Sequence, residues 1–207
     1  MPMVIILPSK DKTYLFADNN EYNPFTTTEK TSKRSFSIQK FKNFVIAHND
    51  EKKFAELVEK VDFDSFPEPL TKGDLIRGFY SIFIDHLVDD SSSDVKDEYL
   101  EDSDFSLFIM GKDYAFVINS DYICSLSKIE GLGDYEIAVP IYKVLKDKTS
   151  DEELIKIMMK KSAEFCGSVD FPFIMVTSDD LDTLKIVDEN LNIKDVPFDQ
   201  VWRKKNA

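Results

Sequence analysis

The spacing of apolar residues switches repeatedly between strand-like and helix-like along this chain, and this alternation limits the folds open to it. Two short apolar runs come first, Val4–Leu7 and Tyr14–Ala17, separated by the turn-forming residues Pro8–Lys12. Ser35–Ile38 alternates between polar and apolar residues, and Phe44–Ala47 is a further apolar run. The opening of the sequence therefore predicts two β-hairpins.

Helical spacing replaces this pattern after the second hairpin. Asn49 or Asp50 can cap a helix whose apolar residues recur at i, i+3, i+4 and i+7 up to Val61. Thr71 and Asp74 form a capping box that opens a second helix. This second helix is apolar on more than one side, through Leu75, Ile76, Phe79, Tyr80, Ile82 and Phe83. Because a core-facing stripe is only about 100° wide, we expect part of this surface to lie beneath a neighbouring subunit.

The second half of the chain repeats the alternation. The predicted elements are strands over Ser106–Met110, Tyr114–Ile118 and Tyr122–Leu126, helices over 135–145 and 150–165, and strands over Phe171–Val176 and Leu184–Val187. Pro140 predicts a kink or a late start in the first of these helices, because proline removes a backbone hydrogen bond inside a helix. Ser150 and Glu153 form a capping box at the start of the next.

This element order predicts an α+β fold in which two sheets pack face to face between outer helices, a four-layer αββα sandwich. No repeat or linker interrupts it, so we expect a single domain over residues 1–207. An acidic loop at about 89–104 is predicted within a segment whose acids are Asp85, Asp89, Asp90, Asp94, Asp97, Glu98, Glu101, Asp102 and Asp104. The segment fits a solvated loop, and a surface for a divalent cation or a basic partner is the alternative, although the spacing of a calcium-binding loop is missing.

Charge and composition exclude several classes of function. A formal net charge of −13 argues against binding to nucleic acid or to an anionic membrane surface. No apolar run approaches the roughly 18 residues that span a bilayer. Cys124 and Cys166 read as reduced core thiols of a cytoplasmic protein, since no CxxC spacing is present. With only His48 and His86 available, neither a zinc site nor a cofactor is expected.

The register of the first strands resembles proteasome β-type subunits and the related bacterial peptidase, which are N-terminal-nucleophile hydrolases. Lys10–Asp18 resembles the family segment that ends in an aspartate at the end of the second strand, and Asp18 lies 16 positions after Pro2 and 16 before Arg34. This is the family's spacing from nucleophile to aspartate to lysine. Arg34–Ile38 and Phe44–His48 resemble the two strands that follow.

A second block extends the resemblance over nearly the whole chain, with the poorest match in the acidic segment. Ile129–Tyr135 resembles the family's entry to its third helix. Asp151–Phe165 and Phe173–Val176 resemble the fourth helix and the strand after it. The resemblance implies the same αββα sandwich and an assembly of subunits, and we expect a homo-oligomer that tightens as salt screens the acids. The resemblance is also compatible with the binding of a further protein partner.

The same resemblance implies that threonine-peptidase chemistry is absent. In the family a terminal hydroxyl attacks a peptide carbonyl, with a lysine nearby and a backbone N–H stabilising the oxyanion. Pro2 stands at the nucleophile's position and Arg34 at the lysine's. Leu132 replaces a serine, and His48 lies in the strand that supplies the oxyanion-hole glycine. Asp18 and Arg34 are then expected to form a structural ion pair within a few ångströms.

An enzyme of altered chemistry is the alternative. Removal of Met1 would leave Pro2 as a free secondary amine, and the charge of Arg34 would lower the pKa of that amine. The amine could then act as a general base, with His48 as the acid. In the competing interpretation His48 is a turn residue at a strand end. Two classes of function follow from the sequence: a non-catalytic subunit, and an enzyme built on Pro2, Asp18, Arg34 and His48.

Overall fold

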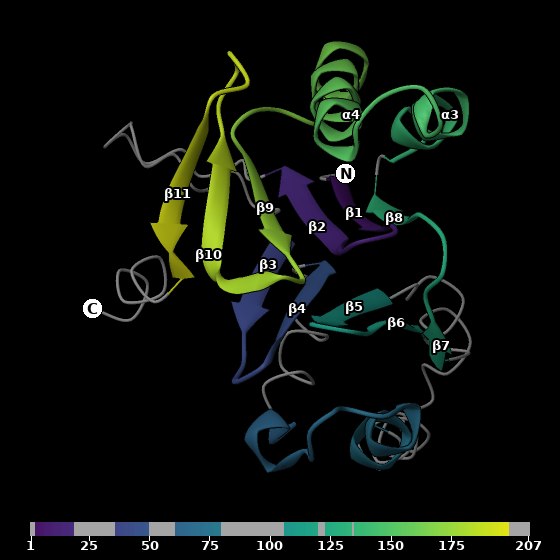
Figure 1. The fold of residues 1–207 in the computed structure, drawn as a ribbon, viewed down its shortest axis with the longest axis vertical. Helices are drawn as coiled ribbons and strands as arrows, with labels where there is room; N and C mark the ends of the chain where they lie inside the picture. Colours follow the sequence, from purple (N-terminus) through teal and green to yellow (C-terminus); the bar gives the residue numbers. More distant parts are fainter. Residues whose placement is uncertain are drawn as a thin grey trace, which may run out of the picture.

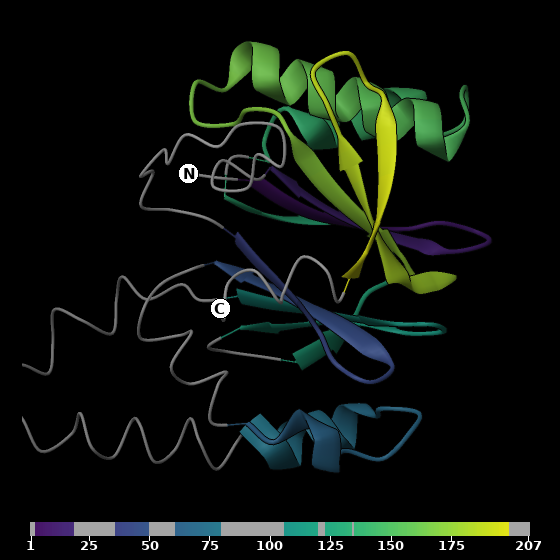
Figure 2. The ribbon, with the colours of Figure 1, turned by 90° about the vertical axis from the view of Figure 1, so that its left-hand side faces the viewer.

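The structure is a computed structural model. It describes residues 3–18, 36–49, 61–79, 106–119, 123–133 and 135–198. In these ranges two antiparallel sheets lie face to face between two layers of helix (Figures 1 and 2). The predicted four-layer αββα arrangement is confirmed. Residues 50–60 of the helix expected up to Val61 and the acidic loop at about 89–104 lie outside the described residues.

The first sheet carries the start and the end of the described chain. Its strands are β1 (Met3–Pro8), β2 (Thr13–Asp18), β8 (Glu130–Gly133), β9 (Phe173–Thr177), β10 (Asp180–Val187) and β11 (Ile193–Pro197). Their order across the sheet is β11-β10-β9-β2-β1-β8. The first strand of the chain is therefore an interior strand, paired antiparallel with β2 on one side and with β8 on the other.

The second sheet is a meander in chain order. Its strands are β3 (Phe36–Lys40), β4 (Phe44–Asn49), β5 (Ser106–Gly111), β6 (Ala115–Asn119) and β7 (Ile123–Ser125). Each strand pairs with the next. The chain passes from β7 in this sheet directly to β8 at the edge of the other (Figure 1).

Helices cover the outer face of each sheet. Above the first sheet lie α3 (Ala138–Leu145) and α4 (Asp151–Phe165), and below the second lie η1 (Phe63–Ser65) and the helical residues 72–79 (Figure 2). The capping box of Thr71 and Asp74 forms with both of its hydrogen bonds, whereas Ser150 caps α4 only by accepting one from the Glu153 N–H. Helix α3 starts late, as predicted, so Pro140 lies in its first turn, where proline is tolerated.

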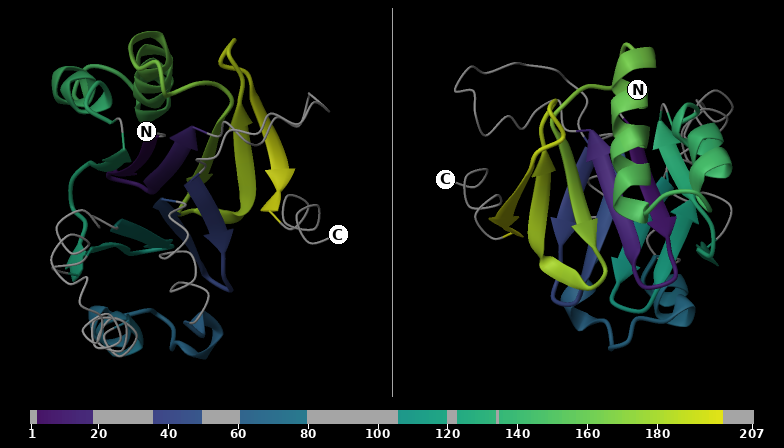
Figure 3. Two further views of the ribbon diagram at one scale, coloured as in Figure 1. Left: turned by 180° about the vertical axis from the view of Figure 1, so that it is seen from behind. Right: turned by 45° about the horizontal axis from the view of Figure 1, so that its top comes forward.

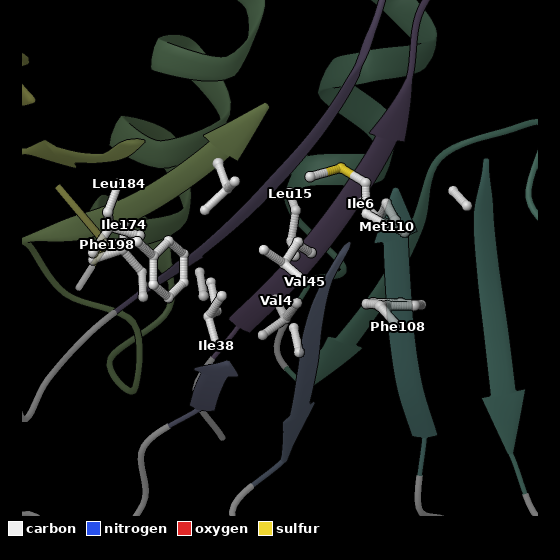
Figure 4. Packing of buried hydrophobic residues seen from close by; sticks show 14 of the residues in the cluster. Val4, Ile6, Leu15, Ile38, Val45, Phe108, Met110, Ile174, Leu184 and Phe198 are labelled. Atoms are coloured by element: carbon white, nitrogen blue, oxygen red, sulfur yellow. The ribbon is translucent and has the colours of Figure 1, made fainter. Parts of the chain in front are cut away.

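Strand alternation divides the core into three clusters. Val4 and Ile6 face the space between the sheets, whereas Met3, Ile5 and Leu7 face α3 and α4. Figure 4 shows the inter-sheet cluster, in which side chains of both sheets point toward one another. A third cluster, with Leu75 and Phe79, lies between the second sheet and the lower helix layer.

The structure corrects three predictions. Gly131–Gly133 forms part of strand β8, and Tyr135 precedes α3 because Gly133, at φ 71°, turns the chain first. Strand β11 was not expected, because its exposed outer edge carries a polar sequence without a clear apolar run. The prediction of two core thiols is wrong: Cys124 is exposed in the short edge strand β7, and Cys166 is only half-buried at the end of α4.

One buried hydroxyl yields a stability prediction. Ser162 of α4 is fully buried, and its Oγ has no hydrogen-bond partner in the described part of the chain. Ser162→Ala is expected to raise the free energy of unfolding by about 1 kcal/mol, because it removes an unsatisfied hydroxyl and favours the helix. Ser150→Ala, on the same helix, removes the N-cap and should lower it by about 1 kcal/mol. Urea unfolding of both variants checks this, and destabilisation by Ser162→Ala would reveal a bound water or other partner.

Candidate functional site

The candidate site is built around Asp18, at the point where β2 ends beside the start of β1. Val4 pairs with Ala17, so Met3 reaches the level of Asp18. The Met3 N–H donates a hydrogen bond to Oδ1 of Asp18 at 2.5 Å. Asp18 is fully buried, although carboxylates are seldom buried completely without compensation. The carboxyl group therefore ties the first described residue of the chain to the interior of the sheet.

A second backbone group acts on the same carboxyl. Asp18 pairs with Phe173 at the start of β9, and the backbone of Asp170, in the connection from α4 to β9, favours the ionised form of the carboxyl group. Burial raises the pKa of Asp18 to about 7, while the N–H groups of Met3 and Asp170 act in the opposite direction. Asp18 thus changes its protonation state near neutral pH.

Asp170 was not among the residues predicted from the sequence. It contributes through its main chain, and a backbone donor leaves no signature in the type of side chain. In the sequence Asp170 lies in the connection between the predicted helix and the strand after it, and no motif marks it.

Leu132 lies at the opposite edge of β1. It pairs with Val4 in the β1–β8 ladder, and its partly buried side chain packs against the inter-sheet core. The neighbouring Gly131 needs to be glycine, because a Cβ there would lie 2.3 Å from Cγ of Tyr135. Leu132 offers no polar side-chain atom, so at this position the chain presents an apolar surface.

His48 lies in the second sheet. It pairs with Leu107 of β5 and is fully buried. Side chains alternate along β4, so His48 shares a face with Phe44 and Ile46, which belong to the cluster above the lower helix layer. By the same rule Asp18 shares a face of β2 with Tyr14 and Phe16, beneath α4. The alternation therefore directs His48 and Asp18 to the outer faces of the two sheets.

Pro2 and Arg34 lie outside the described residues, so the Asp18–Arg34 ion pair remains a prediction. What the structure brings together is Asp18 and the N–H groups of Met3 and Asp170. Among the described residues, no group of three or more His, Cys, Asp or Glu side chains could hold a metal ion. No helix in these ranges is long and apolar enough to cross a membrane.

Several solved structures share this arrangement. Anbu, an ancestral β-subunit from Yersinia bercovieri, aligns with a TM-score of 0.60 at 10% identity, covering 91% of this chain and 88% of Anbu. HslV from Trypanosoma brucei aligns with a TM-score of 0.54 at 12% identity, covering 84% of this chain and 98% of HslV. The bacterial proteasome homologue BPH from Thiobacillus denitrificans aligns with a TM-score of 0.54 at 16% identity, covering 84% of this chain and 96% of BPH.

The chain has the fold of the proteasome-like N-terminal-nucleophile hydrolases. No protein-family model and no curated sequence matches it. At identities of 10 to 16% the similarity concerns the fold, so the chemistry of this chain has to be argued from its own residues.

Proposed function

We propose that this chain is a proteasome-subunit-like protein without threonine-peptidase chemistry, which acts through assembly or through binding of a protein partner. The observation that carries the proposal is the position of β1. Met3–Leu7 are all apolar and buried, and the strand lies between β2 and β8. Neither Pro2 nor any residue of this buried stretch offers a hydroxyl or a thiol.

The nearest hydroxyl groups downstream are at the wrong end of β1. Ser9 follows the strand, and its Oγ donates a hydrogen bond to Asp151 at the start of α4. Thr13 opens β2. A chain shortened to expose either residue as its first would lose an interior strand and the hydrogen bond from Met3 to Asp18. Proteolytic processing to Ser9 or Thr13 is therefore not expected to supply a hydroxyl nucleophile.

The remaining positions support the same proposal. Leu132 places an aliphatic side chain where the resemblance implies a serine. His48 is directed by strand alternation toward the lower helix layer, away from the start of β1. Asp18 accepts a hydrogen bond from the Met3 N–H and serves the fold there by fixing the start of β1.

The purified protein is expected not to cleave fluorogenic peptides and not to react with electrophilic inhibitors of threonine peptidases. The reason is the missing hydroxyl at residue 2. Intact mass measured after incubation with inhibitor gives the readout, with an active proteasome-type peptidase as the positive control. Stoichiometric labelling at the N-terminus would overturn the proposal. Pro2→Thr alone should not restore activity, because Arg34, His48 and Leu132 remain.

Exposed apolar side chains on the helix layers support a role in assembly. Ile76 is 42% exposed in the lower layer, while Val144 and Phe165 are 59% and 68% exposed on α3 and α4. An Anbu complex from Pseudomonas aeruginosa, with a TM-score of 0.55 at 10% identity and covering 99% of this chain, is described as a helical assembly. We expect a homo-oligomer here that tightens with salt. Light scattering at low and high salt tests this, and a monomer under both conditions would contradict it.

The second candidate is an enzyme that uses the amine of Pro2. It is favoured by one observation, since burial raises the pKa of Asp18 to about 7 beside the residue that follows Pro2. The mass of the mature chain discriminates between this enzyme and a non-catalytic subunit. If Met1 is retained, the amine of Pro2 is blocked and the enzyme is eliminated as a candidate. If Met1 is removed, covalent trapping of a carbonyl probe at Pro2 would support it.

A further inference from the structure

Strand β11 is held to the rest of the molecule by few contacts. Among the described strands it pairs only with β10, and four of its five residues are exposed. Its apolar anchors are Val196, which packs against the inter-sheet cluster, and Phe198, which directly follows the strand and is buried in that cluster with Ile174 and Leu184 (Figure 4). Strand β11 and Phe198 can therefore leave the sheet without breaking any pairing between other described strands.

The turn that joins β10 to β11 has a leucine at a position that suits glycine. The Leu191 N–H donates a hydrogen bond to the Asp188 carbonyl at 2.9 Å, and Leu191 itself is left-handed, with φ 62°. A three-residue hairpin loop of this kind usually carries glycine at its left-handed position. In the described part of the chain no other residue except glycine has a positive φ. Because Leu191 has a Cβ, the closed turn is strained there.

Other contacts hold the turn closed. Oδ1 of Asp188 accepts hydrogen bonds from the N–H groups of Asn190 and Asn192, both at 2.9 Å. Oδ2 of the same carboxylate accepts one from the side-chain amide of Asn192 at 3.0 Å. The half-buried side chain of Leu191 packs against the cluster beneath α4. Opening the turn breaks these contacts but relieves the strain at Leu191, so residues 188–192 can act as a hinge.

The hinge lies at the end of the first sheet that carries Asp18. Val187 pairs with Phe173, and Phe173 pairs with Asp18, so the end of β10 is level with Asp18 two strands away. Two strand spacings amount to roughly 10 Å. Figure 3 shows the β10–β11 hairpin at the edge of the sheet, with its tip on the same side of the molecule as α4. A second molecule attached through the hinge is therefore joined at the end of the sheet that holds the candidate site.

We propose that two copies of this chain exchange β11 together with Phe198, so that each copy completes the first sheet of the other. The hinge becomes extended and links the copies. The pairs of the β10–β11 ladder re-form between the copies, including the ion pair of Lys185 with Asp195. Because these contacts are the same in monomer and dimer, the balance depends on the hinge and on protein concentration. The exchange is independent of the chemistry at residue 2 and of contacts between helix layers.

Two substitutions at Leu191 isolate the strain in the hinge. Leu191→Ala and Leu191→Gly both remove the side-chain contact with the cluster beneath α4, but only glycine adopts this φ without steric cost. A dimer opens two hinges, so the dimerisation constant of Leu191→Gly should be lower than that of Leu191→Ala by roughly ten-fold or more. Both variants have the same helix layers, so association there contributes equally. Sedimentation equilibrium gives both constants, and equal constants would overturn the proposal.

Engineered cysteines show directly whether the strand is exchanged. Lys185 and Asp195 are partners in the β10–β11 ladder. In a Cys124→Ser background, which removes an exposed thiol, a Lys185→Cys copy is mixed with an Asp195→Cys copy, incubated at high concentration and oxidised. Neither copy can join positions 185 and 195 within itself, so a disulfide between them reports exchange. Lys112→Cys, at an exposed position of the β5–β6 turn, replaces Lys185→Cys in the control for random collisions.

A second control carries both cysteines in one chain. Lys185→Cys/Asp195→Cys should form its disulfide within the chain, which shows that the ladder geometry accepts the bond. Exchange predicts that the mixed copies give the disulfide between 185 and 195 several-fold above the Lys112→Cys control, in a product of dimer mass. Mixed copies that link no more than this control, while the single-chain variant closes its bond, would overturn the proposal.

Discussion

A chain that begins at Ser9 is expected not to fold. Deleting residues 1–8 removes β1 from between β2 and β8, and with it five buried side chains of Met3–Leu7. At about 1.5 to 3 kcal/mol for each buried side chain, the loss is on the order of 10 kcal/mol. A domain is stable by only about 5 to 15 kcal/mol, so this loss removes most or all of the stability.

Circular dichroism and the urea midpoint measure the result. The matched control lacks only residues 1 and 2 and keeps β1 whole, so it should fold. A shortened chain that starts at Ser9, folds cooperatively and cleaves peptides would show that processing can create a nucleophile. That outcome would refute the proposed absence of peptidase chemistry, whereas an unfolded product leaves residue 2 as the position that decides the chemistry.

The strands of the hairpins were predictable because each is a short apolar run bounded by turn residues. Val4–Leu7 and Tyr14–Ala17 lie inside β1 and β2, and both capping boxes mark helix starts correctly. Strands β8 and β11 were missed for a physical reason. Each is short and has no apolar run: β8 reads Glu-Gly-Leu-Gly, and β11 reads Ile-Lys-Asp-Val-Pro and is largely exposed.

The candidate site was predictable in part. The position of Asp18 followed from its spacing to Pro2, but its complete burial did not, because burial depends on the α4–β9 connection packing over the end of β2. The direction of His48 could have been read from alternation with Phe44 and Ile46 once β4 was assigned as a strand. The roles of the N–H groups of Met3 and Asp170 could not be predicted from the sequence, since every residue except proline carries the same donor.

The buried carboxyl of Asp18 is expected to make the protein less stable as the pH rises toward neutrality. In the unfolded chain the pKa of Asp18 is near 3.8, and burial raises it to about 7 in the folded state. Between these values the folded state binds more protons than the unfolded state, so the free energy of unfolding falls with increasing pH. The contribution of Asp18 to the free energy of unfolding is greatest below pH 3.8 and is lost by the time the pH has passed about 7.

Asp18→Asn removes this dependence. Asparagine has the same shape, stays neutral and retains an oxygen to accept the Met3 N–H. The pKa difference corresponds to about 4 kcal/mol, so the variant should exceed the wild type by roughly this amount at about pH 8.5. At about pH 5.5 the excess should be smaller by about 2 kcal/mol. Asp113→Asn, in an exposed turn, is the control for loss of one negative charge.

Urea unfolding over this pH range gives the free energies directly, and the sign of the result discriminates between two environments of Asp18. A more stable Asn variant means that burial dominates and that the folded protein keeps the carboxyl neutral up to about pH 7. A variant destabilised by several kcal/mol at pH 8.5 would mean that a cation holds Asp18 ionised, as the expected ion pair with Arg34 requires, because removing one partner leaves the other charge uncompensated. Arg34→Met should then cause a comparable loss, and Asp18→Asn/Arg34→Met should recover part of it.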